Sequence, residues 1–133
     1  MTYMLDTNTI IYAINNRPEF VLREFRKHDP ADLCISSITL AELEYGVWKS
    51  SKPDRNRLAL LTFLSAIDIL PFDANAAREY GEIRHQLTSQ GTPIGSNDLL
   101  IAAHAKAEGL TLVTNNIKEF ERVPHLKLAN WAA

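Results

Sequence analysis

The sequence predicts an α/β protein, a three-layer sandwich in which helices cover both faces of a central, mostly parallel sheet of four to five strands. Two observations carry this prediction. Short apolar stretches alternate with longer segments of helical character, and residues typical of helix starts follow most of those stretches. The chain has 133 residues, of which 46% are hydrophobic and 23% charged, which suits one domain with a real core. We therefore expect a single domain over residues 1–133.

Each expected strand is a short apolar stretch that ends at a polar or turn-forming residue. The expected strands are residues 3–5, 33–35, 67–72, 110–113 and, as an edge strand, 126–128. Helices are expected where a side chain can accept hydrogen bonds from first-turn amides, or where proline suits the first turn. They are a helix after Asp6, one from Pro18 to His28, then 38–50, 53–66, 74–90, 99–107 capped by Ser96 or Asn97, and about 118–120.

The net charge of −2 argues against a protein that binds polyanions through its overall charge. Any contact with nucleic acid must therefore use a local basic patch. Two groups of basic residues could provide one, although a solvated helix face is an equally good interpretation of each. The groups are Arg17, Arg23, Arg26 and Lys27, and then Lys49, Lys52, Arg55 and Arg57. The residues that would contact a nucleic acid stay unknown at this point.

Cys34 is the only cysteine, so an intrachain disulfide is impossible, and a reducing, cytoplasmic setting is expected. It lies in the apolar stretch 33–35, which predicts a small buried side chain. No charged-then-apolar leader opens the chain, and no apolar run is long enough to cross a bilayer. We expect a protein that is neither exported nor membrane-spanning.

Acidic and amide side chains fall where the carboxyl ends of the expected strands meet. Asp6 follows the first strand, and Asn115 and Asn116 follow the fourth. Glu42 lies in the helix after the second strand, and Asp98 begins the helix that leads into the fourth. Ligands of open α/β sheets bind outside this edge. Because crowded carboxylates repel one another, such a cluster indicates a divalent cation that prefers oxygen ligands.

Each acid also has an ordinary structural interpretation. Asp6 could cap the first helix, as Thr7 could, and Asp98 could be a favourable charge near a helix N-terminus. Glu42 could be a solvated surface acid, and the helical wheel does not separate Glu42 from Glu44, because both faces carry apolar groups. Later in the Asp98 helix, His104 points away from that carboxylate and is interpreted as a structural or interface residue.

Four segments resemble, in order, the sequence blocks of PIN-domain nucleases, and most closely those of VapC toxins from bacterial toxin–antitoxin pairs. The segments are Met4–Asn8, Ser36–Gly46, Gly95–Ala105 and Val113–Phe120. The resemblance spans nearly the whole chain and implies a PIN-like fold. It implies that Asp6, Glu42 and Asp98 hold Mg²⁺ or Mn²⁺, and it selects Glu42 over Glu44.

The chain departs from that pattern at one position. Many PIN domains carry a fourth acid just after the Thr-Asn of the last block, where this chain has Asn116. An amide adds no charge, so a second metal ion would be held weakly or not at all. Glu119 is a candidate substitute, and its alternative interpretation is a surface acid on a short helix. The resemblance also implies supporting roles, such as holding Asp6 and donating to ligands, for Thr7, Asn8, Thr114 and Asn116.

The resemblance implies a function as well. VapC toxins are metal-dependent endoribonucleases, and this subgroup stops translation by cutting initiator tRNA in the anticodon stem-loop. The expected products are a 5′-phosphate and a 3′-hydroxyl. The expected partners are a second copy in a homodimer, a cognate VapB-type antitoxin that blocks the site, and operator DNA reached only through the antitoxin.

Two other functions compete with this interpretation. The run Asp6-Thr7-Asn8-Thr9 loosely resembles the opening motif of haloacid-dehalogenase-like enzymes, in which an aspartate is the phosphotransfer nucleophile. That motif requires a second acid at the position of Asn8. It also requires a lysine that assists the nucleophile, and no such lysine can be identified in this sequence. The other competitor is a non-catalytic PIN-like binding module, whose sign would be the loss of one of the three acids. All three are present.

Overall fold

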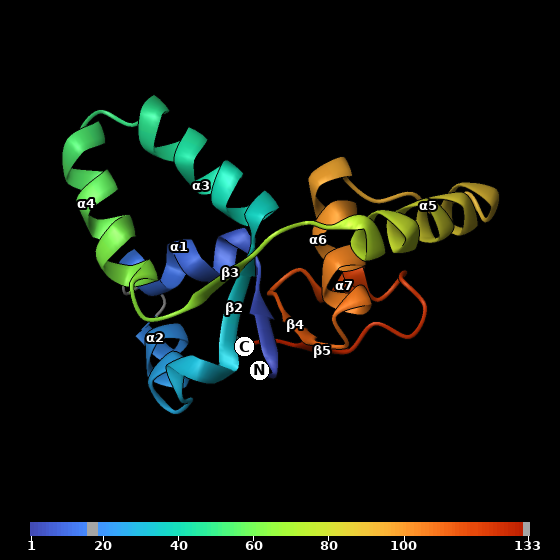
Figure 1. Ribbon diagram of the computed structural model, residues 1–133, viewed down its shortest axis with the longest axis horizontal. Coiled ribbons are helices and arrows are strands. Elements are labelled where there is room, and N and C mark those ends of the chain that lie inside the picture. Colours follow the sequence, from blue (N-terminus) through green and yellow to red (C-terminus); the bar gives the residue numbers. More distant parts are fainter. Residues whose placement is uncertain (16–18, 132–133) are drawn as a thin grey trace.

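A five-stranded parallel sheet runs through the centre of the protein (Figure 1). The structure is a computed structural model, and it describes residues 1–15 and 19–131. The strand order is β3-β2-β1-β4-β5, and every neighbouring pair is parallel. The strands are β1 (Tyr3–Leu5), β2 (Leu33–Ser36), β3 (Asp68–Leu70), β4 (Thr111–Val113) and β5 (Leu128–Ala129). The predicted parallel α/β sheet is confirmed.

The helices fall close to the predicted segments. They are α1 (Thr7–Asn15), α2 (Glu19–Arg26), α3 (Ser37–Lys49), α4 (Pro53–Leu64), α5 (Ala74–Ser89), α6 (Ser96–Ala107) and α7 (Ile117–Phe120). Pro18, the predicted start of the second helix, lies outside the described residues. In Figure 1, α3 and α4 form a hairpin on one side of the molecule, and α5 extends to the other. Within the described residues, no helix is long and apolar enough to span a membrane.

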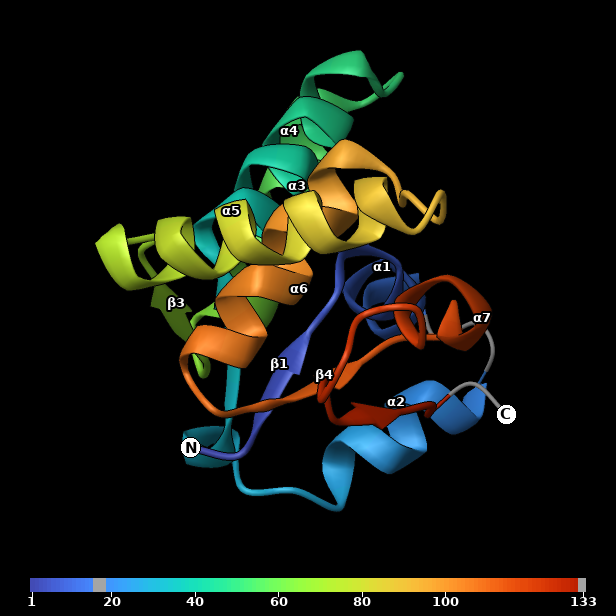
Figure 2. The same ribbon diagram turned by 90° about the vertical axis from the view of Figure 1, so that its right-hand side faces the viewer.

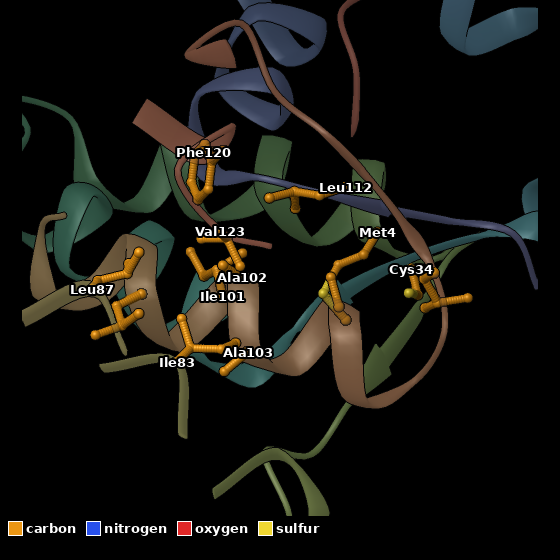
Figure 3. Close-up of a cluster of buried hydrophobic side chains, with 13 residues drawn as sticks. Met4, Cys34, Ile83, Leu87, Ile101, Ala102, Ala103, Leu112, Phe120 and Val123 are labelled. Atoms are coloured by element: carbon orange, nitrogen blue, oxygen red, sulfur yellow. The ribbon is translucent and has the colours of Figure 1, made fainter. Parts of the chain in front are cut away.

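Each face of the sheet packs against its own set of helices. Met4, Cys34 and Leu112 belong to a buried cluster with residues of α5, α6 and α7 (Figure 3). Their strand neighbours, such as Leu5 and Val113, belong to a second cluster with residues of α1, α3 and α4. Because both faces are covered, the strands are apolar at consecutive positions instead of alternating. This arrangement gives the predicted three layers.

Two features of the second half differ from the sequence prediction. The helix α6 begins at Ser96, three residues earlier than predicted, and its N-cap is Gly95 without a side-chain hydrogen bond. The predicted capping role of Ser96 or Asn97 is therefore wrong, and Asp98 lies inside the first turn. The last strand pairs over Leu128–Ala129, not over the predicted 126–128.

The burial predicted for Cys34 is confirmed. This thiol is fully buried, and burial raises its pKa to about 12, so it stays protonated and unreactive at neutral pH.

Trp131 holds the C-terminal segment against the domain, since its ring stacks on His28 with centroids 4.7 Å apart and meets the edge of Tyr3.

The position of β1 in the sheet determines where a ligand can bind. After β1, the chain adds β2 and then β3 on one side of it, and β4 and β5 follow on its other side. The direction in which strands are added therefore reverses between β1 and β4. Figure 2 shows these two strands side by side, with α1 starting at the end of β1. The crevice outside such a reversal point is the usual ligand site of open α/β sheets.

Candidate functional site

Asp6 lies at this reversal point as the first residue after β1. Its backbone N–H donates to the carbonyl of Val113 at 3.0 Å, which holds it beside the end of β4. The residue is 5% exposed, and its Oδ1 accepts a hydrogen bond from the N–H of Thr9 at 2.9 Å. Burial raises the pKa of Asp6, and hydrogen bonds from Thr114 and Thr9 oppose that rise. Asp6 therefore caps α1 and also presents its carboxylate at the crevice.

Glu42 and Glu44, which the helical wheel could not separate, have different surroundings. Glu42 accepts from the hydroxyl of Thr7 at 2.5 Å through Oε1 and from Nδ2 of Asn97 at 3.2 Å through Oε2. These donors belong to α1 and α6, so Glu42 faces the crevice. Glu44 instead accepts from Nη1 of Arg57 on α4 at 2.6 Å. Helix α3 thus directs one glutamate towards Asp6 and the other away from it.

Asp98 joins the other acids from the first turn of α6. Its pKa is raised to about 6, first by burial and then by the negative charges of Glu119, Asp6 and Glu42. Burial is the larger cause of this rise, and the charges of the three acids add to it because Glu119, Asp6 and Glu42 lie in the neighbourhood of Asp98. Four acids from four separate chain segments therefore lie around the same crevice.

Glu119 is the fourth member of this cluster. Its Oε1 accepts from the N–H of Gly95 at 2.8 Å, and its Oε2 accepts from Nδ2 of Asn116 at 2.6 Å. Asn116, which stands where many PIN domains have an acid, thus orients the acid three residues further on. Thr114 fixes Asn116 in turn by accepting its backbone N–H at 3.0 Å. Glu119 lies on the short helix α7 and is partly exposed, as the alternative interpretation expects, but both of its carboxylate oxygens accept hydrogen bonds.

Several supporting residues differ from those predicted. Thr7 donates to Glu42, a predicted ligand, which fits the predicted supporting role, whereas Asn8 is exposed. Asn97 and Gly95 were not expected to contact the acids, and the only sequence signal was their place one and three residues before Asp98. In residues 1–15 and 19–131, no three acid, histidine or cysteine side chains stand close enough to hold a metal ion as they are. A cation would have to draw these carboxylates together.

A buried hydrogen bond joins the two helices that carry Glu42 and Asp98. The Nδ1 atom of His104 on α6 lies 2.7 Å from Oγ of Ser36, and the same Oγ caps α3 by accepting from the N–H of Ile38 at 3.1 Å. His104 has no exposed surface, and burial lowers its pKa. The predicted structural role of His104 is confirmed.

We expect the stability that His104 contributes to be lost as the pH falls below about 6.5, because His104 is then protonated in the unfolded chain but not in the folded one. This contribution to the free energy of unfolding should fall by up to about 1.4 kcal/mol per pH unit. Urea unfolding of wild type, His104→Asn and the exposed-site control His85→Asn measures this. The slope should be flatter for His104→Asn alone, and identical slopes for all three proteins would contradict the assignment.

The profile of the PIN-domain family matches residues 3–126, a span that contains all four acids. The chain belongs to the PIN-domain family. It is 52% identical to ribonuclease VapC2 of Rickettsia felis, over 98% of each chain. It is 45% identical to the tRNA(fMet)-specific endonuclease VapC of Salmonella typhimurium, again over 98% of each chain. These relatives place the chain among VapC proteins.

A solved VapBC structure has the same fold. The crystal structure of VapBC2 from Rickettsia felis, bound to a DNA fragment from its promoter, contains a chain that superposes with a TM-score of 0.92. The two chains are 50% identical, and the match covers 98% of this chain and 99% of that one. The predicted resemblance to VapC-type PIN domains is confirmed.

Proposed function

We propose that this PIN-domain protein is the toxin of a type II toxin–antitoxin pair, a metal-dependent endoribonuclease that cuts initiator tRNA in its anticodon stem-loop. The observation that supports the proposal best is the raised pKa of Asp98, to which Glu119, Asp6 and Glu42 contribute around the reversal point of the sheet. The substrate follows the relatives, which are named as ribonucleases and, in Salmonella typhimurium, as a tRNA(fMet)-specific endonuclease.

Asp6, Glu42, Asp98 and Glu119 would hold Mg²⁺ or Mn²⁺. The raised pKa of Asp98 supports this role, because a cation would relieve the repulsion that raises it. All four side chains offer the carboxylate oxygens that hard cations prefer. A bound divalent cation would supply a water of lowered pKa and would neutralise charge developing on the phosphate. With no charge at Asn116, we propose one tightly held cation.

The chain's own donors prepare the acids for this task. Thr7 and Asn97 hold the two oxygens of Glu42, and Gly95 and Asn116 hold those of Glu119. Each hydrogen bond restricts the rotation of a long side chain while leaving other lone pairs of the carboxylate free. The scissile phosphate would lie over the crevice between β1 and β4, and its hydrolysis would leave a 5′-phosphate and a 3′-hydroxyl.

The two competing functions, a haloacid-dehalogenase-like enzyme and a non-catalytic binding module, have less support. Family membership sets aside a haloacid-dehalogenase-like enzyme, and Asn8 supplies no second acid in any case. A non-catalytic module would have no need for four acids with oriented side chains, and a cleavage assay separates it from an enzyme.

The antitoxin has a groove available next to the site. A hollow of about 330 Å³ lies between α1, α3 and α4, with mostly apolar walls and with Glu42 at its border. We propose that a segment of the VapB-type antitoxin fills this groove and covers the acids, as expected for a partner that blocks the site. Binding of operator DNA would then occur through the antitoxin, and the Rickettsia felis complex with promoter DNA supports this proposal.

We propose a homodimer that uses the exposed face of α3. Tyr45 and Trp48 on this face are 67% and 71% exposed, which is unusual for large aromatic side chains outside an interface. Light scattering of the purified toxin should give a dimer, and Trp48→Ala should shift it towards monomer at micromolar concentration. The control Leu58→Ala, 67% exposed on α4, should remain dimeric. A monomeric wild type would contradict the proposal.

The substrate is tested by mapping RNA ends in cells. Expression of wild type should produce a new 5′-phosphate end in the anticodon stem-loop of initiator tRNA, and expression of Asp6→Ala should not. Co-expression of the antitoxin should restore intact tRNA. A cut in another RNA would remove the tRNA assignment and leave the nuclease intact, and no new end at all would contradict both.

A further inference from the structure

Gly95 is the one glycine of this chain whose missing side chain borders the acids. A Cβ atom placed there would lie 3.6 Å from Oδ2 of Asp98 and 3.6 Å from Oε1 of Glu119. The Cβ positions of the other glycines meet no atom within 4 Å, and these residues are Gly46, Gly81, Gly91 and Gly109. A side chain at position 95 would therefore point at two of the four carboxylates.

The backbone angles do not require glycine here. Gly95 has φ −55° and ψ 147°, values that any L-residue adopts, whereas Gly91 and Gly109 have positive φ and fit the usual need for glycine. A Cβ at 3.6 Å would make an ordinary van der Waals contact, so a small side chain is sterically tolerated by the fold. The added side chain would instead reduce access to Oδ2 of Asp98 and Oε1 of Glu119.

The N–H of Gly95 has a separate task, which any residue except proline could perform. It donates to Oε1 of Glu119 at 2.8 Å and so holds that carboxylate beside Asp98. The backbone thus approaches the acids closely, and a methyl group in place of the Gly95 hydrogen would cover the oxygens that the N–H helps to position. Close approach of the main chain to a ligand is a recognised use of glycine.

We propose that Gly95 is a positioning residue of the nuclease site, which keeps Asp98 Oδ2 and Glu119 Oε1 open to the cation and its water molecules. This inference rests on the proposed metal-dependent function. Mg²⁺ keeps several waters and demands near-ideal octahedral geometry, so one methyl group in its hydration shell weakens binding. A methyl group at this position reduces access to the two oxygens without disturbing the fold.

The test compares Gly95→Ala and the bulkier Gly95→Val with wild type and with Gly81→Ala. Gly81 lies exposed in α5, where an added Cβ meets nothing, so its substitution is a matched control. Melting temperatures are measured in EDTA and across a Mn²⁺ or Mg²⁺ titration, and kcat and KM are measured for RNA cleavage. In EDTA, Gly95→Ala should melt close to wild type. Its half-saturating metal concentration should rise about tenfold or more, and that of Gly95→Val further, with kcat reduced at subsaturating metal.

Equal metal affinity in Gly95→Ala, Gly95→Val and wild type would overturn the inference and leave the proposed nuclease standing. Loss of affinity in Gly81→Ala as well would also overturn it, since the effect would not be local to the acids. If Gly95→Ala melts at a lower temperature than wild type in EDTA, Mn²⁺ binding is measured directly at a temperature at which the variant is folded. The Mn²⁺ affinities of the variants and wild type are then compared in the same way. A wild type that neither binds metal nor cuts RNA would instead contradict the proposed function.

Discussion

Replacing Asp98 by asparagine should abolish RNA cleavage, with a loss of at least about 1,000-fold in kcat/KM. The amide keeps the size and partly the hydrogen bonding of the side chain, but it removes the charge that would bind the cation. The assay is cleavage of initiator tRNA at saturating Mg²⁺. Asp54→Asn, a substitution at an exposed aspartate in the first turn of α4, should cut normally. Normal cleavage by Asp98→Asn would remove Asp98 from the site.

The same substitution should stabilise the protein when no metal is present. The pKa of Asp98 in the folded protein is about 6, above the 3.8 of a free aspartate, so its negative charge opposes folding at pH values above about 6. This destabilisation fades as the pH falls from 6 towards 4. At pH 8 in EDTA, we expect Asp98→Asn to be more stable by on the order of 1–2 kcal/mol, since partial exposure reduces the full effect. A lower stability of Asp98→Asn than of wild type would contradict the crowding of acids.

The second large effect is expected at Glu42 and not at its neighbour Glu44. Glu42→Gln removes a carboxylate that Thr7 and Asn97 orient into the crevice, and cleavage should fall by at least about 100-fold. Glu44→Gln changes only the pair with Arg57 on the far side of α3, an ion pair with about a third of each side chain exposed, and cleavage should stay within about twofold. Both variants are compared by tRNA cleavage under the same conditions. Equal losses would mean that α3 is rotated from the orientation described.

Much of the fold could be predicted from the sequence because its strands are short and sharply bounded. Consecutive apolar residues such as Met4 and Leu5 indicate a strand buried on both faces, and the helices between such strands make the sheet parallel. The start of α6 was misplaced because Asn97 has the chemistry of a cap but uses its amide on Glu42, a residue of a distant segment. Local propensity carries no information about such a contact.

The site was only partly accessible from the sequence for the same reason. Asp6 and Asp98 could be placed from strand and helix ends alone. Glu42 depended on the family resemblance, because both faces of α3 are partly apolar, and only the contacts with Thr7 and Asn97 separate it from Glu44. Gly95 and the orienting role of Asn116 depend on how α7 approaches the loop before α6. That approach is a tertiary feature with no local signature.

The central claim, that these carboxylates cut RNA with a divalent cation, is tested most directly by cleavage with purified protein. Initiator tRNA is incubated with wild type in EDTA and then after addition of excess Mg²⁺ or Mn²⁺, with Asp98→Asn in parallel. We predict no cut in EDTA, a single cut in the anticodon stem-loop with a 5′-phosphate after metal is added, and none with Asp98→Asn. Equal cleavage by wild type in excess EDTA, or cleavage by Asp98→Asn at the wild-type rate, would contradict the account.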